Sequence, residues 1–473
     1  MTLLDESEIM PATTPCAQRA YEDRYQPCQL MGATTAATAI ADSVVSYHGP
    51  GGCRMTIEHL RSDNVPDGIY TMVLSSGVDQ GDVIHGGTNK LRQMLQETAV
   101  QMATRHKAKI IWLVTACAAS IIGDDIEMAA QQAEKKTGLK VIPIDTPGFG
   151  GGFTKGFQKV YRALLDHFVE APGPGSQSNV LNLIGPHLIG SKNWPWDYRE
   201  MMRLMESADI RPNLVLTHKT KVDDVRDHFL EAAANYVLTP EELPDFEEKC
   251  DELGIPNWGQ ELVLPIGMAN TEEWYLEIAR RFGDEGKAKR QLKEDMDLLR
   301  SRLKWDYNAS WVMHDLSGKH VAVIGQAGYA AAMARCLLYD FNLRPVLIGL
   351  LGESPRAIAA GRKLLSEVES LAHPQIMENP TFFEWGTAVR DSVADFVVGM
   401  KQDRVLTEGM KVPHLPLGGF YFLNQFNFIP WPYLGVRGVL GLLTELSKVM
   451  EDVKHEKDSW RALSYIKPRG ETA

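Results

Sequence analysis

Three cysteines in the first quarter of the chain have the side chains and the settings needed to bind iron and sulfide. Cys28, Cys53 and Cys117 are separated by gaps of 24 and 63 residues, too wide for a zinc knuckle or a thioredoxin-type pair. Each lies among small residues or beside an expected element end, where backbone N–H groups can approach a sulfur and lower the thiol pKa. Three thiolates are one short of the usual four for an iron–sulfur cluster. We therefore expect another residue type or another chain to complete the site, which suggests a subunit interface.

Cys28 and Cys53 each have a local setting that suits a metal-bound thiolate. Cys28 precedes the Ala-rich stretch Gln29–Ser43, which is predicted to be helical, and a helix N-terminus favours a negative sulfur. The alternative for Cys28 is a small buried side chain. Cys53 ends the loop HGPGGC, in which Gly51 and Gly52 leave room for backbone to pack against an inorganic sulfide. The alternative for that loop is a plain turn.

Cys117 directly follows the apolar strand predicted over Lys109–Thr115. Folds that alternate strands and helices place their ligands at the carboxyl ends of parallel strands, so this position favours a ligand role. The run continues as IIGDD, and we interpret Asp124 and Asp125 as a turn and N-cap that open the next helix.

Two glycine-rich segments follow expected strands. The segment TPGFGGG, over residues 146–152, has no GxxxxGK spacing, so contact of its backbone with a cluster or a partner is favoured over phosphate binding. The segment GQAG, over residues 325–328, is only half of a dinucleotide fingerprint and is weak evidence for a nucleotide. No HExxH or GxSxG motif is present. Any chemistry should therefore depend on the cysteines.

Short apolar strands alternate with amphipathic helices along the whole chain, which predicts an α/β fold of doubly wound parallel sheets. The predicted buried strands are Ile110–Val114, Val141–Ile144, Val180–Ile184, Leu214–Leu216, Val321–Ile324, Val346–Leu350 and Phe396–Val398. The predicted helices between them include Lys90–Arg105, Asp124–Lys136, Glu272–Arg281 and Ile358–Glu369.

Two breaks divide the chain into segments that are each large enough for one sheet domain. Ala171–Ser178 is rich in Pro, Gly and Ser and is typical of a linker, and the charged stretch Asp284–Leu303 predicts a solvated connecting helix. We therefore predict domains over residues 1–175, 176–304 and 305–473, which are of ordinary size.

The composition excludes several functional classes. At 44% hydrophobic and 23% charged residues the chain has ordinary soluble globular composition, and its formal net charge of −12 argues against nucleic-acid binding. No apolar run is long enough for a membrane span, and the acidic N-terminus is unlike a secretory signal. Six cysteines in 473 residues do not form a disulfide framework. We expect a reducing, cytoplasmic location.

The combined motifs resemble the β subunit of nitrogenase component 1 and its nitrogenase-like relatives. The resemblance rests on CQLMGATTAATAIADSVVSYHGPGGC, VIHGG, TACAASIIGDD and TPGFGGG, and it is best over Pro27–Phe157. It continues more weakly through LPIG at 264–267, DLSGKHVAVIG at 315–325 and the helix start GVRG at 435–438.

The resemblance implies three Rossmann-like domains and an α2β2 assembly. In it, each αβ pair would share an [8Fe-7S] P-cluster or a simpler [4Fe-4S] cluster, with Cys28, Cys53 and Cys117 as the β-side ligands. Gly51, Gly52 and Gly148 would give the cluster backbone room. A separate ATP-dependent iron protein with its own [4Fe-4S] cluster would dock on the αβ surface. Electrons would then pass through the shared cluster to a cofactor in the α subunit.

The resemblance favours the β over the α subunit. The α pattern has a cofactor-binding Cys in the second domain, where this chain has Tyr236-Val-Leu-Thr-Pro240, and a late His, which Leu415–Leu440 lacks. The motifs HGP and IGDDIE are α-like, but the 24-residue first gap is β-like.

Two departures from the β pattern put dinitrogen reduction in doubt. Gly148 stands where a true nitrogenase has a Ser, and the segment before the final helix reads FNFIPWPY, over residues 426–433, without histidines. Both favour a nitrogenase-like reductase such as a methylthio-alkane reductase, which would cleave a C–S bond and release methanethiol and a hydrocarbon. The alternatives are a dinitrogen-reducing β subunit, a cofactor-assembly scaffold, and an α/β binding protein without metal.

Overall fold

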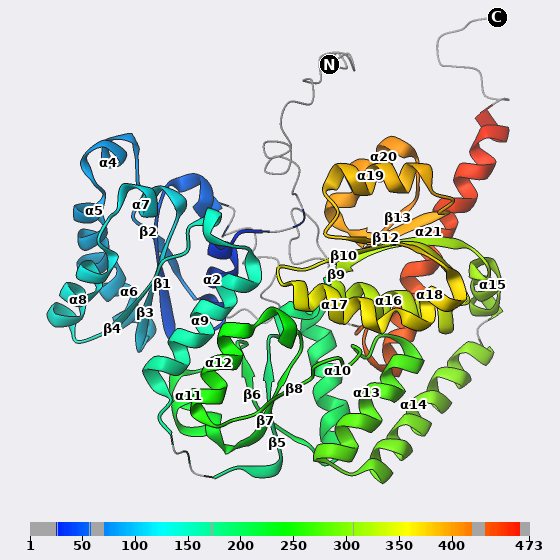
Figure 1. Ribbon diagram of the computed structural model, residues 1–473, viewed down its shortest axis with the longest axis horizontal. Coiled ribbons are helices and arrows are strands. Elements are labelled where there is room, and N and C mark those ends of the chain that lie inside the picture. The colour runs from blue at the N-terminus through cyan, green and yellow to red at the C-terminus, as the bar shows by residue number, and fades with distance from the viewer. Residues whose placement is uncertain are drawn as a thin grey trace, which may run out of the picture.

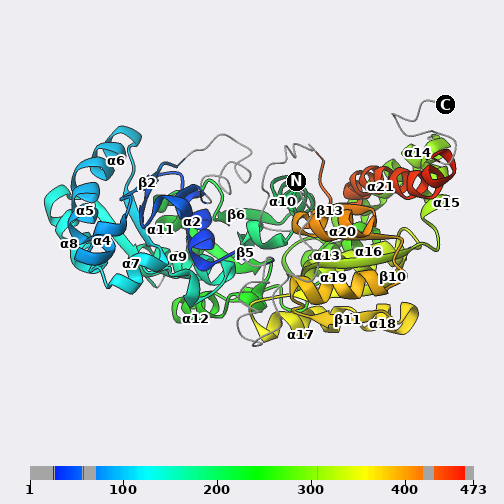
Figure 2. The same cartoon turned by 90° about the horizontal axis from the view of Figure 1, so that it is seen from above.

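Three parallel β-sheets, each covered by helices, make up the protein (Figure 1). The computed structural model describes residues 25, 27–55, 57, 71–171, 173, 175–305, 307–418 and 431–463. The first and third sheets lie at opposite ends of the molecule, and the second lies between and below them in Figure 1 (Figure 2). The α/β fold with three doubly wound sheets predicted from the sequence is therefore confirmed.

The first sheet has the strand order β2-β1-β3-β4, and all of its neighbouring strands are parallel. The strands are β1 (Ser43–His48), β2 (Val73–Ser75), β3 (Ile110–Thr115) and β4 (Lys140–Ile144). Every residue of β1 and β3 is buried, as expected for strands with helices on both faces.

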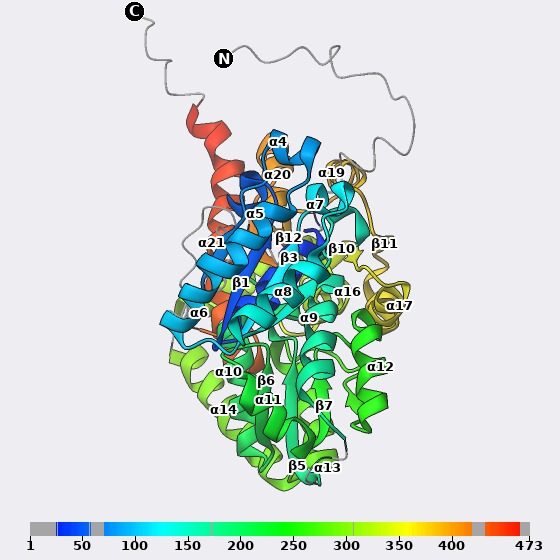
Figure 3. The ribbon, with the colours of Figure 1, turned by 90° about the vertical axis from the view of Figure 1, so that its left-hand side faces the viewer.

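Alternate residues of β3 pack against two different sets of helices. Trp112 and Val114 belong to the core shared with α2 (Gln29–Thr38) and α9 (Phe153–Phe168). Ile111 and Leu113 pack on the opposite face, against the helical residues 88–106 and α8 (Ile126–Thr137). Figure 3 shows α8 and the helices labelled α5 (Thr88–Gln93) and α6 (Val100–His106) on the outer face of the molecule.

Two glycines let α2 and α9 pack at backbone contact. A Cβ on Gly32 would lie 1.8 Å from the carbonyl oxygen of Phe153, and a Cβ on Gly156 would lie 2.0 Å from the carbonyl oxygen of Gln29. No other residue type fits at either position without moving a helix. The close packing brings the start of α2 beside the start of α9, which positions Cys28 for the site described below.

The second sheet has the order β6-β5-β7-β8 and the third has the order β11-β10-β9-β12-β13, again all parallel. The strands of the second are β5 (Gln177–Ile184), β6 (Arg211–Leu216), β7 (Ala232–Val237) and β8 (Asn257–Trp258). Those of the third are β9 (His320–Gln326), β10 (Arg344–Leu351), β11 (Gln375–Glu378), β12 (Phe396–Met400) and β13 (His414–Gly418).

Helices connect and cover these two sheets. The larger ones are α10 (Trp194–Ser207), α12 (Pro244–Leu253), α13 (Gly267–Phe282), α14 (Glu285–Trp305), α15 (Tyr307–Leu316), α16 (Ala327–Tyr339), α17 (Pro355–Leu364), α18 (Ser366–Ala372), α19 (Phe382–Asp391) and the final helix α21 (Gly435–Leu463). Among the described residues, none of the helices combines the length and the apolar character needed to cross a membrane.

The seven predicted strands are confirmed, but the helix predicted over Gln29–Ser43 is too long. Helix α2 ends at Thr38, and Ser43 is the first residue of β1, which sequence reasoning missed. The sequence SVVSYH contains two serines and a histidine, so it does not have the continuous apolar character from which the other strands were predicted, although all of its residues are buried. The charged connecting helix predicted over Asp284–Leu303 is found as α14. Residues 419–430, which include most of the segment before the final helix, lie outside the described residues.

Candidate metal centre

Two of the three candidate cysteines follow the adjacent strands at which the first sheet reverses its order. The chain passes from β1 outward to β2, and then returns to place β3 on the other side of β1. His48 at the end of β1 pairs with Thr115 at the end of β3, and the N–H of Ala116 donates to the carbonyl of His48 over 2.9 Å. Such a switch point is where open α/β sheets bind ligands. Cys53 and Cys117 lie on the segments that leave it.

Cys28 and Cys117 both lie close to Gly148. The Gly148 N–H donates to the sulfur of Cys117 over 2.9 Å. A Cβ on Gly148 would lie 3.1 Å from the sulfur of Cys117 and 3.5 Å from that of Cys28. A side chain at 148 would therefore crowd both sulfurs, and the backbone N–H there is directed at one of them.

The N-termini of two helices fix the position of Cys28. It is the N-cap residue of α2, it pairs with Gly152, the N-cap residue of α9, and the N–H of Gln29 donates to the carbonyl of Gly151 over 2.9 Å. The N–H groups of Leu30 and Met31 approach its sulfur. This is the environment that stabilises a thiolate.

Burial nevertheless raises the pKa of the Cys28 thiol above its ordinary value. The N–H groups of α2 oppose that shift, and the neighbouring Cys117 and Cys53 add to it. The expectation of a lowered thiol pKa is therefore wrong for Cys28 in the metal-free chain. Because burial and two like charges disfavour a free thiolate, bound iron would be needed to keep this sulfur deprotonated.

Cys53 lies in a short helical stretch, residues 51–55, and its side chain is half-buried. It is within hydrogen-bonding reach of the Tyr47 hydroxyl, which also donates to the carbonyl of Pro50 over 3.1 Å. Burial, followed by Cys53, strongly raises the pKa of Tyr47. Cys117 and Cys28 act on the same phenol. The three sulfurs thus lie close enough to interact electrostatically around one buried tyrosine.

Gly51 and Gly52 are exposed, and a Cβ on either would meet no atom of the described residues within 4 Å. Among those residues, none requires glycine at either position. In the described part of the chain, no three His, Cys, Asp or Glu side chains are grouped tightly enough to hold a single metal ion.

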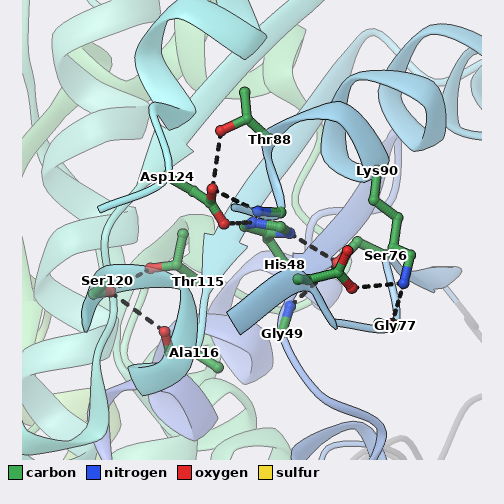
Figure 4. A network of polar contacts seen from close by, with 12 residues as sticks. His48, Gly49, Ser76, Gly77, Thr88, Lys90, Thr115, Ala116, Ser120 and Asp124 are labelled. Atoms are coloured by element: carbon green, nitrogen blue, oxygen red, sulfur yellow. Dashed lines mark hydrogen bonds and ion pairs between the residues drawn. The ribbon is translucent and has the colours of Figure 1, made fainter. Parts of the chain in front are cut away.

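A buried polar network joins the two loops that carry Cys53 and Cys117 (Figure 4). The ring of His48 contacts Asp124 through Nε2 over 2.9 Å and Ser76 through Nδ1 over 2.8 Å. The other oxygen of Asp124 accepts from the N–H of Gly87 over 2.8 Å and the hydroxyl of Thr88 over 2.9 Å. Asp125 alone caps α8, through the N–H of Met128, so the capping interpretation of Asp124 is wrong.

A second carboxylate braces the segment that contains Cys117. Asp145 accepts from the hydroxyls of Thr115 and Ser120, each over 2.6 Å. These two residues flank Cys117 in the sequence, and Asp145 itself leads into the loop of Gly148. Tyr47, His48 and Asp145 were missed from the sequence. Only Asp145 follows a strand that was predicted, whereas the strand that carries Tyr47 and His48 was not predicted.

The fold and site together define a class of α/β proteins with three parallel sheets and a group of cysteines near the switch point of the first sheet. Residues 28–451 match the family described as nitrogenase component 1 type oxidoreductase. The chain belongs to this family.

Several curated relatives align with most of the chain. The nitrogenase iron-iron protein beta chain of Rhodobacter capsulatus is 23% identical and aligns with 93% of this chain and 96% of its own length. The cofactor biosynthesis protein NifE of Methanococcus maripaludis is 23% identical over 82% of this chain and 76% of its own. The solved structure titled nitrogenase Cp1 at pH 6.5 superposes with a TM-score of 0.74 at 18% identity, covering 95% of this chain and 96% of that one.

Proposed function

We propose that this chain is the β-type, electron-relaying subunit of a nitrogenase-like reductase. It would share an iron–sulfur cluster with an α subunit through Cys28, Cys53 and Cys117. The single observation that carries the proposal is Gly148, which lies close to two candidate ligand sulfurs and directs its N–H at one of them. Donors of this kind around cluster sulfurs tune the potential of bound clusters.

The donor set supports an iron–sulfur cluster and its completion by a second protein. Three sulfurs surround the site, fewer than the usual four for a cluster held by one chain. Three large apolar side chains near them in the sequence are exposed: Ile121 is 73% exposed, Phe149 68% and Met55 62%. These side chains lie four, one and two residues from Cys117, Gly148 and Cys53 respectively. Exposed apolar side chains around an incomplete ligand set are typical of a surface that a partner covers.

When bound, an iron–sulfur cluster supplies one-electron transfer. The residues of this chain would hold it and exclude water from it. Cys28 and Cys117 would bind on the closed side beside Gly148, while Cys53 would bind on the open side. Tyr47 would remain a protonated phenol within hydrogen-bonding reach of Cys53, since burial strongly raises its pKa. The network of His48 and Asp124 would hold the two ligand loops at a fixed separation.

The finer proposal concerns the substrate. We favour reductive C–S cleavage of a methylthio-alkane over dinitrogen reduction, because Gly148 offers no hydroxyl to an oxidised cluster. Electrons would come from an ATP-dependent iron protein and would be used at a cofactor in the α subunit. A cofactor-assembly scaffold is the rival function, and the similarity to NifE proteins favours it.

The deciding experiment has two parts. Iron and acid-labile sulfide are measured in the complex purified with its genomic neighbours, together with its electron paramagnetic resonance spectrum. The complex is then supplied with iron protein, ATP and reductant, and products are assayed from dinitrogen and from a methylthio-alkane. Methanethiol release supports the proposal, and ammonia identifies a nitrogenase. Cluster transfer to an acceptor without turnover of either substrate identifies a scaffold.

A further inference from the structure

The chain segment that leads into Cys28 is anchored in the third sheet. Tyr25, three residues before Cys28, is 1% exposed and belongs to the core formed by β9, β10, β12 and α19. Its ring contacts that of Phe382, and the two ring centroids are 5.7 Å apart. Cys28 itself opens α2 beside the first sheet. The short segment between Tyr25 and Cys28 therefore links the two ends of the molecule.

A buried hydrogen bond fixes the position of Tyr25. Its hydroxyl donates to Oδ1 of Asp403 over 2.6 Å, and Oδ2 of Asp403 accepts from the N–H of Met400 over 2.6 Å. Asp403, which precedes α20 (Arg404–Met410), is fully buried. Burial raises the pKa of Asp403 to about 7, and a hydroxyl can bond a carboxyl group in either protonation state. Tyr25 thus satisfies a buried polar group that would be costly to leave without a partner.

A second contact from the third sheet reaches Cys28 through α9. Glu353 follows β10 and accepts from the N–H groups of Thr154 and Lys155, over 2.7 and 3.2 Å, at the N-terminus of α9. A Cβ on Gly152, the N-cap residue of α9, would lie 2.5 Å from Oε1 of Glu353. Gly152 is also the residue that pairs with Cys28. The Glu353 carboxyl group therefore holds the backbone against which Cys28 is placed.

The second sheet holds Glu353 in turn. The N–H groups of Glu353 and Ser354 donate to the carboxyl oxygens of Glu242, over 3.0 and 2.9 Å. Glu242 follows β7, and Glu353 and Ser354 lie in the loop between β10 and α17. All three sheets therefore contribute to the contact at this loop. A loop bound on two sides is a rigid support for the N-terminus of α9.

The other two cysteines are positioned by groups at the strand ends of the first sheet. Cys117 follows β3 and lies between the two residues whose hydroxyls donate to Asp145. Cys53 lies within hydrogen-bonding reach of Tyr47 of β1. A change in the contacts of the third sheet should therefore act on Cys28 before it acts on Cys53 or Cys117.

We propose that Tyr25 and Glu353 are positioning residues of the metal centre, through which the third sheet holds Cys28 in place relative to Cys117. Tyr25 acts through the chain that leads into Cys28, and Glu353 acts through Gly152. The inference deepens the proposed function and rests on it for the role of Cys28 as a ligand.

Alkylation of the metal-free full chain by iodoacetamide tests the proposal, with the rate at each cysteine followed by peptide mass spectrometry. Tyr25→Phe keeps the ring in the core and removes only the hydroxyl, whereas Glu353→Ala removes the acceptor at α9. We expect Cys28 to react about five-fold faster in either variant, because loss of a buried hydrogen bond makes local opening easier. Cys53 and Cys117 should react as they do in the parent.

The matched controls remove similar interactions elsewhere. Tyr236→Phe removes a buried hydroxyl that accepts from Nε1 of Trp274 over 2.7 Å. Asp284→Ala removes an oxygen that accepts from the N–H of Lys287 over 2.9 Å in the first turn of α14. Both controls should leave the alkylation rate of Cys28 as in the parent.

A conservative variant distinguishes positioning from general stability. Glu353→Gln keeps one acceptor oxygen at the N-terminus of α9, so it should restore most of the protection of Cys28 that Glu353→Ala loses. A parental rate at Cys28 in Tyr25→Phe or in Glu353→Ala would refute the role of that residue. Equal acceleration at all three cysteines would show general loosening and would refute the proposal.

The electron paramagnetic resonance spectrum of the iron-loaded complex separates this inference from the proposed function. Tyr25→Phe and Glu353→Ala should change the spectrum, and the two controls should keep that of the parent. A parent complex without iron would refute the proposed function, while alkylation of the metal-free chain would still decide the positioning role. An iron-loaded parent whose spectrum and Cys28 rate are unchanged in both variants would refute the inference alone.

Discussion

His48 and Asp124 form a buried pair, with Nε2 of the ring 2.9 Å from Oδ2 of the carboxylate, that joins the two loops bearing Cys53 and Cys117. Their side chains are 0% and 2% exposed. The pair makes the relative position of two candidate ligands depend on one hydrogen-bonded network rather than on two independent loops.

Asp124→Asn should weaken this network while keeping its shape. Although burial opposes the shift, hydrogen bonds from His48, Thr88 and Gly87 lower the pKa of Asp124 below its ordinary value. A depressed carboxyl pKa stabilises the fold at pH values above the unfolded pKa of about 4, and this contribution is lost as the pH falls below it. The free energy of unfolding of the variant should be about 1–3 kcal/mol lower than that of the parent at pH 7.

Chemical denaturation at pH 3–7 checks this prediction. The difference between the parent and the variant should shrink toward pH 3, since the parent then loses the same interaction. A difference that is constant across the range would mean that the Asp124 carboxylate contributes no charge-dependent stability.

Cys53→Ala should fold normally and lose bound iron and electron transfer. The side chain is half-buried and lies on the open side of the site, so its removal leaves no enclosed core cavity. Iron content, visible absorption and turnover are the measurements.

Cys250→Ala is its control. Cys250 is fully buried in the core, so this variant should lose roughly 1–3 kcal/mol of stability but keep its iron. Loss of iron from Cys250→Ala, or full iron content in Cys53→Ala, would contradict the ligand assignment.

Gly148→Ala should disturb the positions of the two sulfurs that lie close to Gly148. Its methyl group would lie 3.1 Å from the sulfur of Cys117 and 3.5 Å from that of Cys28, which is too tight for an undisturbed pair. We expect lower iron occupancy and a changed electron paramagnetic resonance spectrum, with the unfolding midpoint within a few degrees of the parent. The control is Gly409→Ala, at a helical position where a Cβ meets no atom within 4 Å. It should raise the free energy of unfolding by about 0.5–1 kcal/mol and leave the spectrum as in the parent. Identical spectra for both variants would argue against a cluster at Gly148.

Glu242→Gln should be stabilising at alkaline pH. The pKa of Glu242 is raised to about 8 in the folded chain by burial, followed by Glu353. A raised carboxyl pKa gives a contribution that is full below the unfolded pKa and is lost as the pH rises toward 8, at up to about 1.4 kcal/mol per pH unit. The amide cannot ionise, so the free energy of unfolding of the variant should rise relative to that of the parent as the pH increases from 5 to 8. Parallel stability curves over that range would contradict the raised pKa.

The sequence identified the strands that consist of unbroken apolar runs, but not strands such as β1, β2 and β11, and not the contacts between distant loops. Apolar runs such as IIWLV at 110–114 identify buried strands because few other structures bury five consecutive side chains. The strand SVVSYH escaped notice, since its serines and histidine are polar by type although buried in place. The His48 ring is satisfied by contacts with the distant residues Ser76 and Asp124, and the Ser43 hydroxyl donates to carbonyls of the preceding turn.

For the candidate site, the cysteines and glycines were found because their types are rare and their chemistry is specific. Tyr47 and Asp145 were missed, since a tyrosine within a strand or an aspartate after one is ordinary in any α/β protein. Their part in the site comes from which strand ends meet, as when Asp145 reaches Thr115 and Ser120. Which strand ends meet depends on the order of the strands in the sheet, and a local sequence pattern does not predict that order.

The close packing of α2 on α9 restrains the part of the cysteine site that contains Cys28 more than the part that contains Cys53. The half with Cys28 is set by helices in backbone contact at Gly32 and Gly156, so it cannot widen without separating them. The half with Cys53 borders open space at Gly51 and Gly52. If this fold evolved to hold a larger or smaller cluster, we would therefore expect changes in the segment around Cys53 and in the subunit facing it, while the contact between α2 and α9 stayed the same.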